Sequence, residues 1–145
     1  MADQQGGSLN PNLDLGITGN IGATGSITSS GTLGVGYSTG AGGTVTQATD
    51  KSTGVTLNKI TGAVTMNNAA LNAGVEVSFT VTNSLVAATD AVLAIHASAG
   101  TAGSYLVNAN AVAAGSFQVT VSNASGGNLS EAIVIRFMVF KGVSA

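Results

Sequence analysis

Few residues of this 145-residue chain could take part in acid–base, nucleophilic or metal chemistry. It has one histidine, His96, no cysteine, and six carboxylates spread along its length. The carboxylate before His96, Asp90, lies six residues back in the sequence. Catalysis and metal binding need such groups gathered in one place. We therefore expect no enzyme active site and no cofactor. We expect His96 to be a structural or interface residue, with an ion shared by three copies on a threefold axis as the exception.

The glycine-rich segment 34–43 does not read as a phosphate-binding loop. It lacks the Lys-Ser/Thr ending of a P-loop, and no helix is expected after it. We interpret it as a hinge. The four basic residues are scattered, so no patch could neutralise a phosphate backbone and we expect no nucleic-acid partner. No apolar run reaches the roughly 18 residues of a membrane span, and the first residues lack the features of a signal peptide. We expect no membrane partner and synthesis in a cytoplasm.

Charge is unusually scarce in this sequence. Charged residues make up 7% of the chain, with a net charge of −2, whereas soluble domains carry roughly 25%. The hydrophobic content of 44% argues against disorder. The surface must therefore be built from Ser, Thr, Asn, Gly and Ala. Such a surface produces little repulsion between copies, which suits a protein that spends its life packed against others.

Residues 37–145 have the pattern of an all-β domain. Short β-branched runs alternate with Gly and Asn turns, which is typical of an antiparallel sandwich or a jelly roll. We expect about eight strands, at 44–47, 53–57, 62–66, 75–83, 91–97, 104–109, 115–122 and 131–141.

The last of these strands differs from the others. Strict alternation at 75–82 predicts one buried and one wetted face, but residues 133–140 are apolar on both faces apart from Arg136. We expect this strand to lie centrally or in an interface, where Arg136 must be paired or must extend to solvent. The Asp50-Lys51 pair is expected in a solvated turn.

Residues 1–36 precede the β domain as an arm and a stem. Residues 1–14 are polar, with Leu9, Pro11 and Leu13 as candidate anchors in a partner's groove. The alternative is a disordered terminus without a partner.

The stem carries a six-residue repeat. Large aliphatics fall at Leu15, Ile21, Ile27 and Leu33, with glycines two residues before the last three. Because six is even, an extended chain places all four side chains on one face. We expect three copies to bring these rows together on a threefold axis, since so few repeats cannot close a core alone. The alternative is a linker with an accidental period.

Several segments resemble a domain common in the structural proteins of tailed bacteriophages. They are 42–59, 62–67, 77–80, 82–83, 96–97, 100–103, 129–133 and 141–143, so the likeness covers about 40–145. The stem, 19–31, is similar to repeats that precede such domains in fibre-like phage proteins. The resemblance implies a virion protein, commonly a trimer.

The short chain favours a part that sits on the phage head. We expect a homotrimeric capsid decoration, or cement, protein on the capsid surface, with its arm on the major capsid protein. The alternative is a short tail fibre or fibre tip that binds a cell-surface glycan. The supply of aromatic platforms for a glycan is poor, with two Tyr, four Phe and no Trp. A depolymerase would need paired carboxylates at a cleft, and no local cluster suggests them.

Overall fold

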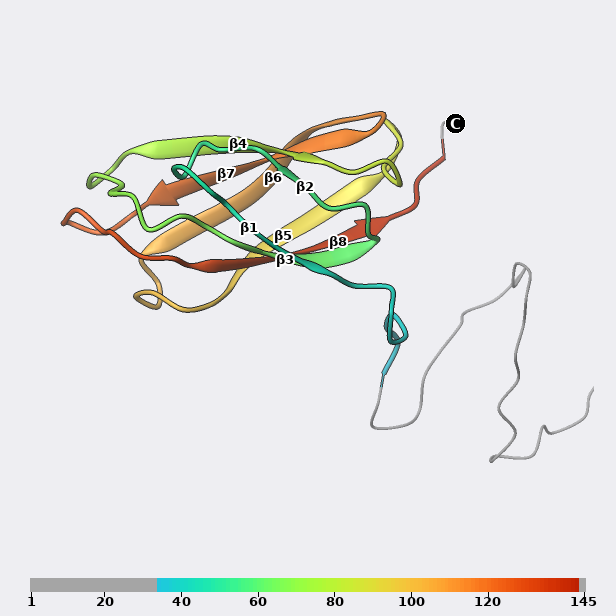
Figure 1. Ribbon diagram of the computed structural model, residues 1–145, viewed down its shortest axis with the longest axis horizontal. Coiled ribbons are helices and arrows are strands. Elements are labelled where there is room, and N and C mark those ends of the chain that lie inside the picture. Colours follow the sequence, from blue (N-terminus) through green and yellow to red (C-terminus); the bar gives the residue numbers. More distant parts are fainter. Residues whose placement is uncertain (1–33, 144–145) are drawn as a thin grey trace, which may run out of the picture. The chain divides into compact units, whose positions relative to one another are not determined.

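The computed structural model describes residues 34–143, and the described residues from Gly36 onward form one compact unit. Eight strands and no helix make up this part of the chain (Figure 1). The strands are β1 (Thr44–Thr46), β2 (Val55–Thr56), β3 (Thr61–Thr65), β4 (Glu76–Thr82), β5 (Ala91–Ser98), β6 (Tyr105–Ala113), β7 (Ser116–Asn123) and β8 (Val134–Phe140). The all-β prediction is therefore confirmed, and each expected strand is present. The largest difference is at β6, which continues to Ala113.

The strands form two four-stranded sheets, which lie over one another as a sandwich (Figure 1). Sheet A has the order β1-β3-β8-β5 and sheet B the order β2-β4-β7-β6. The chain alternates between the sheets over its first four strands, so β1 pairs with β3 and β2 with β4 in parallel. All other pairs are antiparallel. The sheets are thus mixed, which corrects the antiparallel expectation. Strands of two and three residues carry no local signal of their direction.

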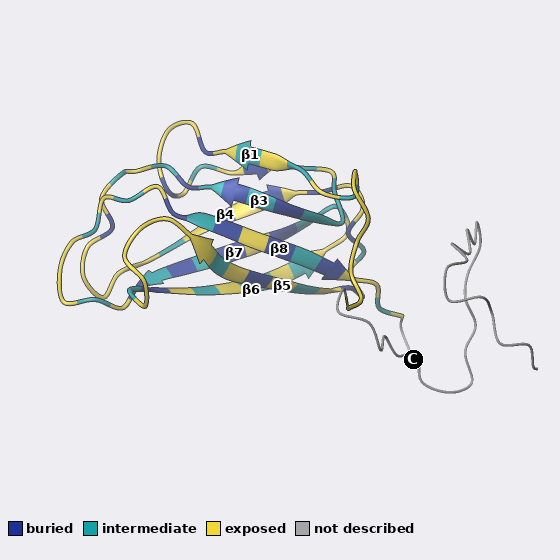
Figure 2. Ribbon diagram, turned by 90° about the horizontal axis from the view of Figure 1, so that it is seen from below, coloured by how far each residue is buried: buried dark blue, intermediate teal, exposed yellow. Residues whose placement is uncertain are grey.

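The central position expected for the last strand is confirmed. In sheet A, β8 lies between β3 and β5 (Figure 2). Its inward residues Ile135, Phe137 and Val139 are buried. Phe137 meets Phe117 of β7 across the sandwich with ring centroids 5.2 Å apart, in an edge-to-face arrangement that favours aromatic pairs. The core therefore joins the two sheets through their middle strands.

Lys51 is buried, which corrects the prediction that Asp50 and Lys51 both lie in a solvated turn. Asp50 does lie in an exposed turn, but Lys51 is only 3% exposed. Its Nζ donates hydrogen bonds of 2.6 Å to the carbonyl oxygens of Asn67 and Glu131. Burial lowers the pKa of the Lys51 ammonium, and the nearby Glu131 charge opposes this. Lys51 thus ties the loop before β2 to the segments that follow β3 and precede β8.

The predicted arm and stem residues lie outside the described part of the chain. They are Leu9, Pro11, Leu13, Leu15, Ile21, Ile27 and Leu33.

Candidate interaction surface

The outer face of sheet A is apolar over β5 and β8, whereas β1 and β3 present Thr44, Thr46, Thr61 and Thr65 on the same side. Leu93 and Ile95 of β5 and Phe140 of β8 are 45%, 46% and 52% exposed. Val134 and Met138 of β8 and Ala63 of β3 point to the same side, because they alternate with the buried residues of their strands. We call these six residues and Arg136 the apolar face. A contiguous exposed patch of this kind marks an interaction site more often than scattered apolar residues do.

The register of sheet A brings these side chains together. Met138 lies between Thr61 of β3 and Leu93 of β5. One row along, Arg136 lies between Ala63 and Ile95. The face exists because β5 and β8 are apolar on both sides, and only one side of each strand can enter the core.

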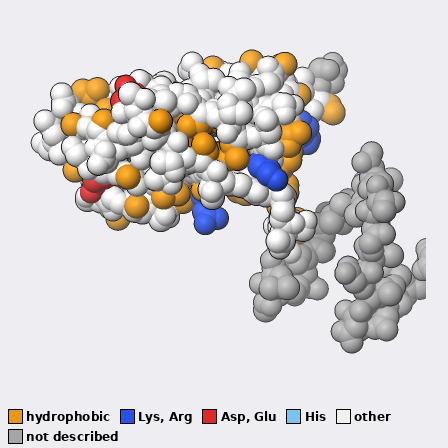
Figure 3. Space-filling model, in the orientation of Figure 1, with side chains coloured by type: hydrophobic (Ala, Val, Ile, Leu, Met, Phe, Trp, Pro, Cys, Tyr) orange, Lys and Arg blue, Asp and Glu red, His pale blue; other side chains and the backbone are white. Residues whose placement is uncertain are grey.

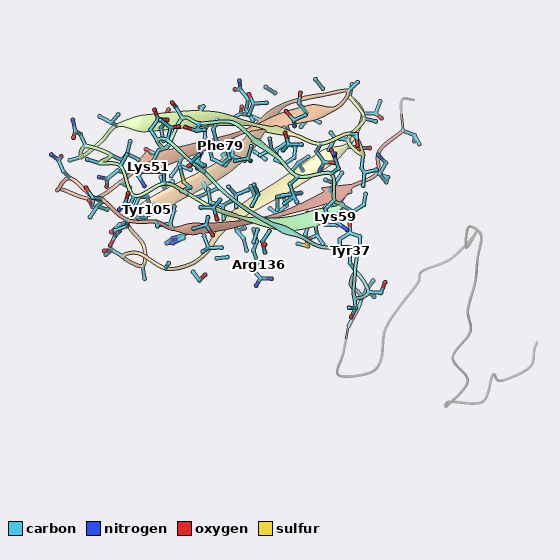
Figure 4. All side chains as sticks on the ribbon, in the orientation of Figure 1. Tyr37, Lys51, Lys59, Phe79, Tyr105 and Arg136 are labelled. Carbon is cyan, nitrogen blue, oxygen red and sulfur yellow. The ribbon has the colours of Figure 1, made fainter. Side chains whose placement is uncertain are left out.

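Arg136 is the single charge at the centre of this face. Its side chain points away from the sandwich (Figure 4). Among the described residues it makes no ion pair, since their one salt bridge joins Lys141 to Asp90. Charged side chains are few and widely separated on the side of the molecule seen in Figure 3. A partner that covers Arg136 must therefore supply an acceptor or leave the guanidinium a path to solvent, because an unpaired buried charge is costly.

A hollow of about 170 Å³ lies beside Arg136. It spans β1, β3 and β8, and glycines line part of it. Gly62 has to be glycine, because a Cβ there would lie 2.6 Å from Leu57 and 2.9 Å from the Phe137 ring. That absent side chain would point into the core, so the hollow itself is a shallow depression on the outer surface beside Arg136, with room for one aliphatic side chain of a partner. The residues that line the hollow are Gly42, Gly43, Thr44, Thr61, Gly62, Ala63 and Arg136.

The outer face of sheet B is polar. Its three central strands present three rows that run Glu76–Ser122–Leu106, Ser78–Thr120–Asn108 and Thr80–Gln118–Asn110. The Ser78 and Thr120 hydroxyls are 2.7 Å apart, and Asn110 donates to Thr120 at 2.8 Å. We call these nine residues the polar face, and Leu106, which is 63% exposed, is its one apolar member. A hollow of about 360 Å³ over β6 and β7 is lined by Glu76, Leu106, Val107, Asn108, Asn110, Thr120 and Ser122.

His96 does not share a face with Arg136. It pairs with Ile135 in the register, and its Nε2 lies 2.7 Å from the carbonyl oxygen of Ala99. Its ring packs against Tyr105 with centroids 5.5 Å apart. These contacts place His96 at the end of the sandwich, in a structural setting rather than on the apolar face.

Glu131 closes the loop at the same end. Its carboxylate accepts hydrogen bonds from the Thr101 amide at 3.0 Å and the Thr101 hydroxyl at 2.8 Å. These bonds lower the pKa of the Glu131 carboxyl. Burial, and next the Glu131 carboxylate, raise the pKa of the Tyr105 hydroxyl to about 12. The arrangement is that of a loop clamp, because Glu131 is already occupied by backbone and hydroxyl donors.

No group of three or more potential metal ligands comes together within residues 34–143. No helix in the same part of the chain is long and apolar enough to cross a membrane. The residues that make the apolar face were not named from the sequence, apart from Arg136. The signal that could have found them is the apolar character of both sides of the last strand.

Comparison with known proteins gives no assignment. No family model, curated protein or solved structure matches this chain.

Proposed function

We propose that this protein is a structural subunit of a bacteriophage particle, and specifically a homotrimeric decoration protein that stabilises the capsid from outside. The observation that carries the assembly role is the apolar face, with Arg136 at its centre. The phage assignment rests on the resemblance of residues 40–145 to a domain of phage structural proteins.

The apolar face explains why the protein would assemble. Burial of apolar surface contributes roughly 25 cal/mol per Å², and large aliphatic and aromatic side chains supply it here. The low charge of the chain removes most of the repulsion that would oppose close packing of copies. A second copy is a natural partner, because every copy exposes this face and the chain carries little charge, but a trimer needs a different surface of that copy to cover it.

Decoration of a capsid requires buried area rather than chemistry. A trimer bound across capsomer junctions would resist internal pressure through contacts to the major capsid protein. We propose that the N-terminal arm contributes to these contacts and that the stem row lies near the threefold axis. In this role the protein acts on the virion surface without catalysis, cofactor or nucleic-acid contact.

A second candidate function is recognition of a cell-surface glycan. The hollow on sheet B favours it, because amide, hydroxyl and carboxylate groups line it beside Leu106 and Val107, and such polar groups bind sugar hydroxyls. Tyr, Phe and Trp are absent from its lining. Glycan sites usually rely on such rings for stacking, so this role is the weaker of the two.

Copy number on purified particles separates the two functions. A decoration protein is present in hundreds of copies, whereas a fibre tip is present in a handful. Quantitative gel analysis against the major capsid protein gives the ratio. A ratio of a few copies per particle would contradict the decoration role.

Solution mass tests the assembly role directly. Sedimentation equilibrium of the full chain at micromolar concentration should give three times the chain mass of 14.0 kDa. A folded monomer under these conditions would contradict the trimer.

A further inference from the structure

We propose that the apolar face of each subunit is covered by the segment around Asp14 of a neighbouring copy, with Leu13 and Leu15 on the face and the Asp14 carboxylate paired with Arg136. This inference rests on the proposed assembly and names which part of the partner makes the contact.

The first argument is the chemistry that the face demands. Its occupant must be apolar enough to cover Leu93, Ile95 and Phe140, and it binds best when it brings one acceptor to Arg136. A large aliphatic side chain would also fit the hollow of about 170 Å³ beside Arg136. The best match is a segment with large apolar residues on both sides of a single carboxylate.

The second argument is elimination among the carboxylates of this chain. Asp90 is taken by Lys141, and Glu131 by Thr101. Asp50 accepts bonds from Ser52 and Thr53 within its own turn. Glu76 stands on the polar face, between polar neighbours.

Two carboxylates remain, both in the N-terminal segment. Asp3 is flanked by Ala2 and Gln4, whereas Asp14 is flanked by Leu13 and Leu15. Residues 1–33 contain no Lys or Arg, so this segment is purely acidic and the face purely basic. Charge complementarity therefore favours this segment, and the flanking leucines select Asp14 over Asp3.

The third argument is reach. The Tyr37 hydroxyl donates to the Val139 carbonyl oxygen at 2.7 Å, which fixes the start of the domain beside β8. From Gly34 back to Asp14 there are 20 residues, which span up to about 66 Å when extended. This is several times the length of β8, so the segment of one copy can reach the face of the next.

The geometry of Arg136 suits such a contact. The long side chain can lie along the apolar face with its stem covered by leucines, while the guanidinium passes beside the segment to its outer side. There it meets Asp14 in a charge-assisted hydrogen bond. Leu15 is then part of this contact, and Ile21, Ile27 and Leu33 remain for the threefold axis.

Disulfide trapping tests the contact, because the natural chain has no cysteine. An Asp14→Cys chain with a length tag is co-expressed with an untagged Arg136→Cys chain and oxidised. We expect a mixed disulfide dimer of intermediate mass on a non-reducing gel. The matched control replaces Arg136→Cys by Glu76→Cys, on the polar face, and should give at least about tenfold less mixed dimer.

Equal trapping at positions 76 and 136, or no trapping at 136, would overturn the inference. A bond formed only within one chain, seen as a monomer of altered mobility in the double variant Asp14→Cys/Arg136→Cys, would overturn it as well. The trimer of the unmodified protein is measured separately by sedimentation, so the proposed assembly can hold while this contact fails.

A charge swap tests the ion pair itself. Asp14→Arg and Arg136→Asp alone should each raise the dissociation constant of the assembly about tenfold or more, because each places like charges together. The double swap should recover most of the loss. A double variant no tighter than the weaker single variant would contradict the pairing.

Discussion

The two outer faces of this sandwich have opposite characters although they are built from the same kind of strand. On sheet B, polar residues alternate with core residues, and hydroxyls and amides bond to one another across β4, β7 and β6. On sheet A, β5 and β8 present Leu93, Ile95, Met138 and Phe140 outward. Strands in which polar and apolar residues alternate thus give the face that is exposed to solvent. Strands that are apolar on both sides give the face that needs a partner.

The largest effect is expected from contrasting a core residue of β8 with an outward residue of β7 on the polar face. Phe137→Ala removes a buried ring that meets Phe117, and it should lower the free energy of unfolding by about 3–5 kcal/mol. The outward change Gln118→Ala on the polar face should alter it by less than ~0.5 kcal/mol. Urea denaturation at one fixed protein concentration measures both. A loss below ~1 kcal/mol at Phe137 would mean that the two sheets are not joined there.

Lysines placed on each outer face test directly whether only the apolar face takes part in assembly. Leu93→Lys with Ile95→Lys should raise the dissociation constant of the assembly by ~100-fold or more, which corresponds to about 2.7 kcal/mol. The matched pair Ser78→Lys with Thr80→Lys, on the polar face, should leave it unchanged. Sedimentation gives the dissociation constants, and circular dichroism checks that each variant is folded. Equal effects on both faces would contradict the assembly role of sheet A.

A smaller effect is expected within the polar face. Ser78→Ala removes one hydroxyl of the pair with Thr120, and such cross-strand contacts contribute roughly 0.2–1 kcal/mol. The unfolding free energy should fall within this range, without any change in the assembly. A changed dissociation constant in this variant would mean that sheet B takes part in the interface, which would contradict the proposal that sheet A alone does so.

Acid should act on the end of the molecule where β5 begins and β8 ends. The Asp90 carboxylate accepts bonds from the Ala87 amide at 2.8 Å, the Lys141 ammonium and the Gly142 amide. The Ala87 bond first, and Lys141 next, lower the pKa of Asp90 from 3.8 to about 2. The ionised Asp90 carboxylate therefore stabilises the folded state at pH values above the pKa of 3.8 that it has in the unfolded chain. This contribution is lost as the pH falls from about 4 through about 2.

The variant Asp90→Asn isolates that contribution. Its unfolding free energy, measured by urea at pH 5 and at pH 2, should fall less over this interval than that of the natural protein. Parallel curves would exclude Asp90 as a source of the acid sensitivity.

Much of the fold could be predicted because alternation and turn residues are local signals. The eight strands and the central place of the last one followed from them. The parallel pairing of β1 with β3 and of β2 with β4 could not be predicted, since strands as short as β1 and β2 are positioned by their neighbours. The burial of Lys51 was also invisible, because its two acceptors lie 16 and 80 residues away in the sequence.

The candidate site was predicted only in outline. Arg136 and an apolar last strand were recognised, but the residues around them depend on the register of β3, β8 and β5. His96 was predicted to be a structural or interface residue, without the partners that hold it. The structure gives it contacts with Ala99 and Tyr105, which fit the structural alternative.

The central position of β8 also has a consequence for when the face can form. β8 is synthesised after β3 and β5, yet these two strands pair with it and not with each other. Until residues 134–140 are made, sheet A lacks its central strand, and the side chains of β3 and β5 cannot align to form the outer face. Pairing across so long a sequence separation is slow to form. The order of synthesis therefore delays association through this face until β8 has been made, and it limits association of chains that lack β8.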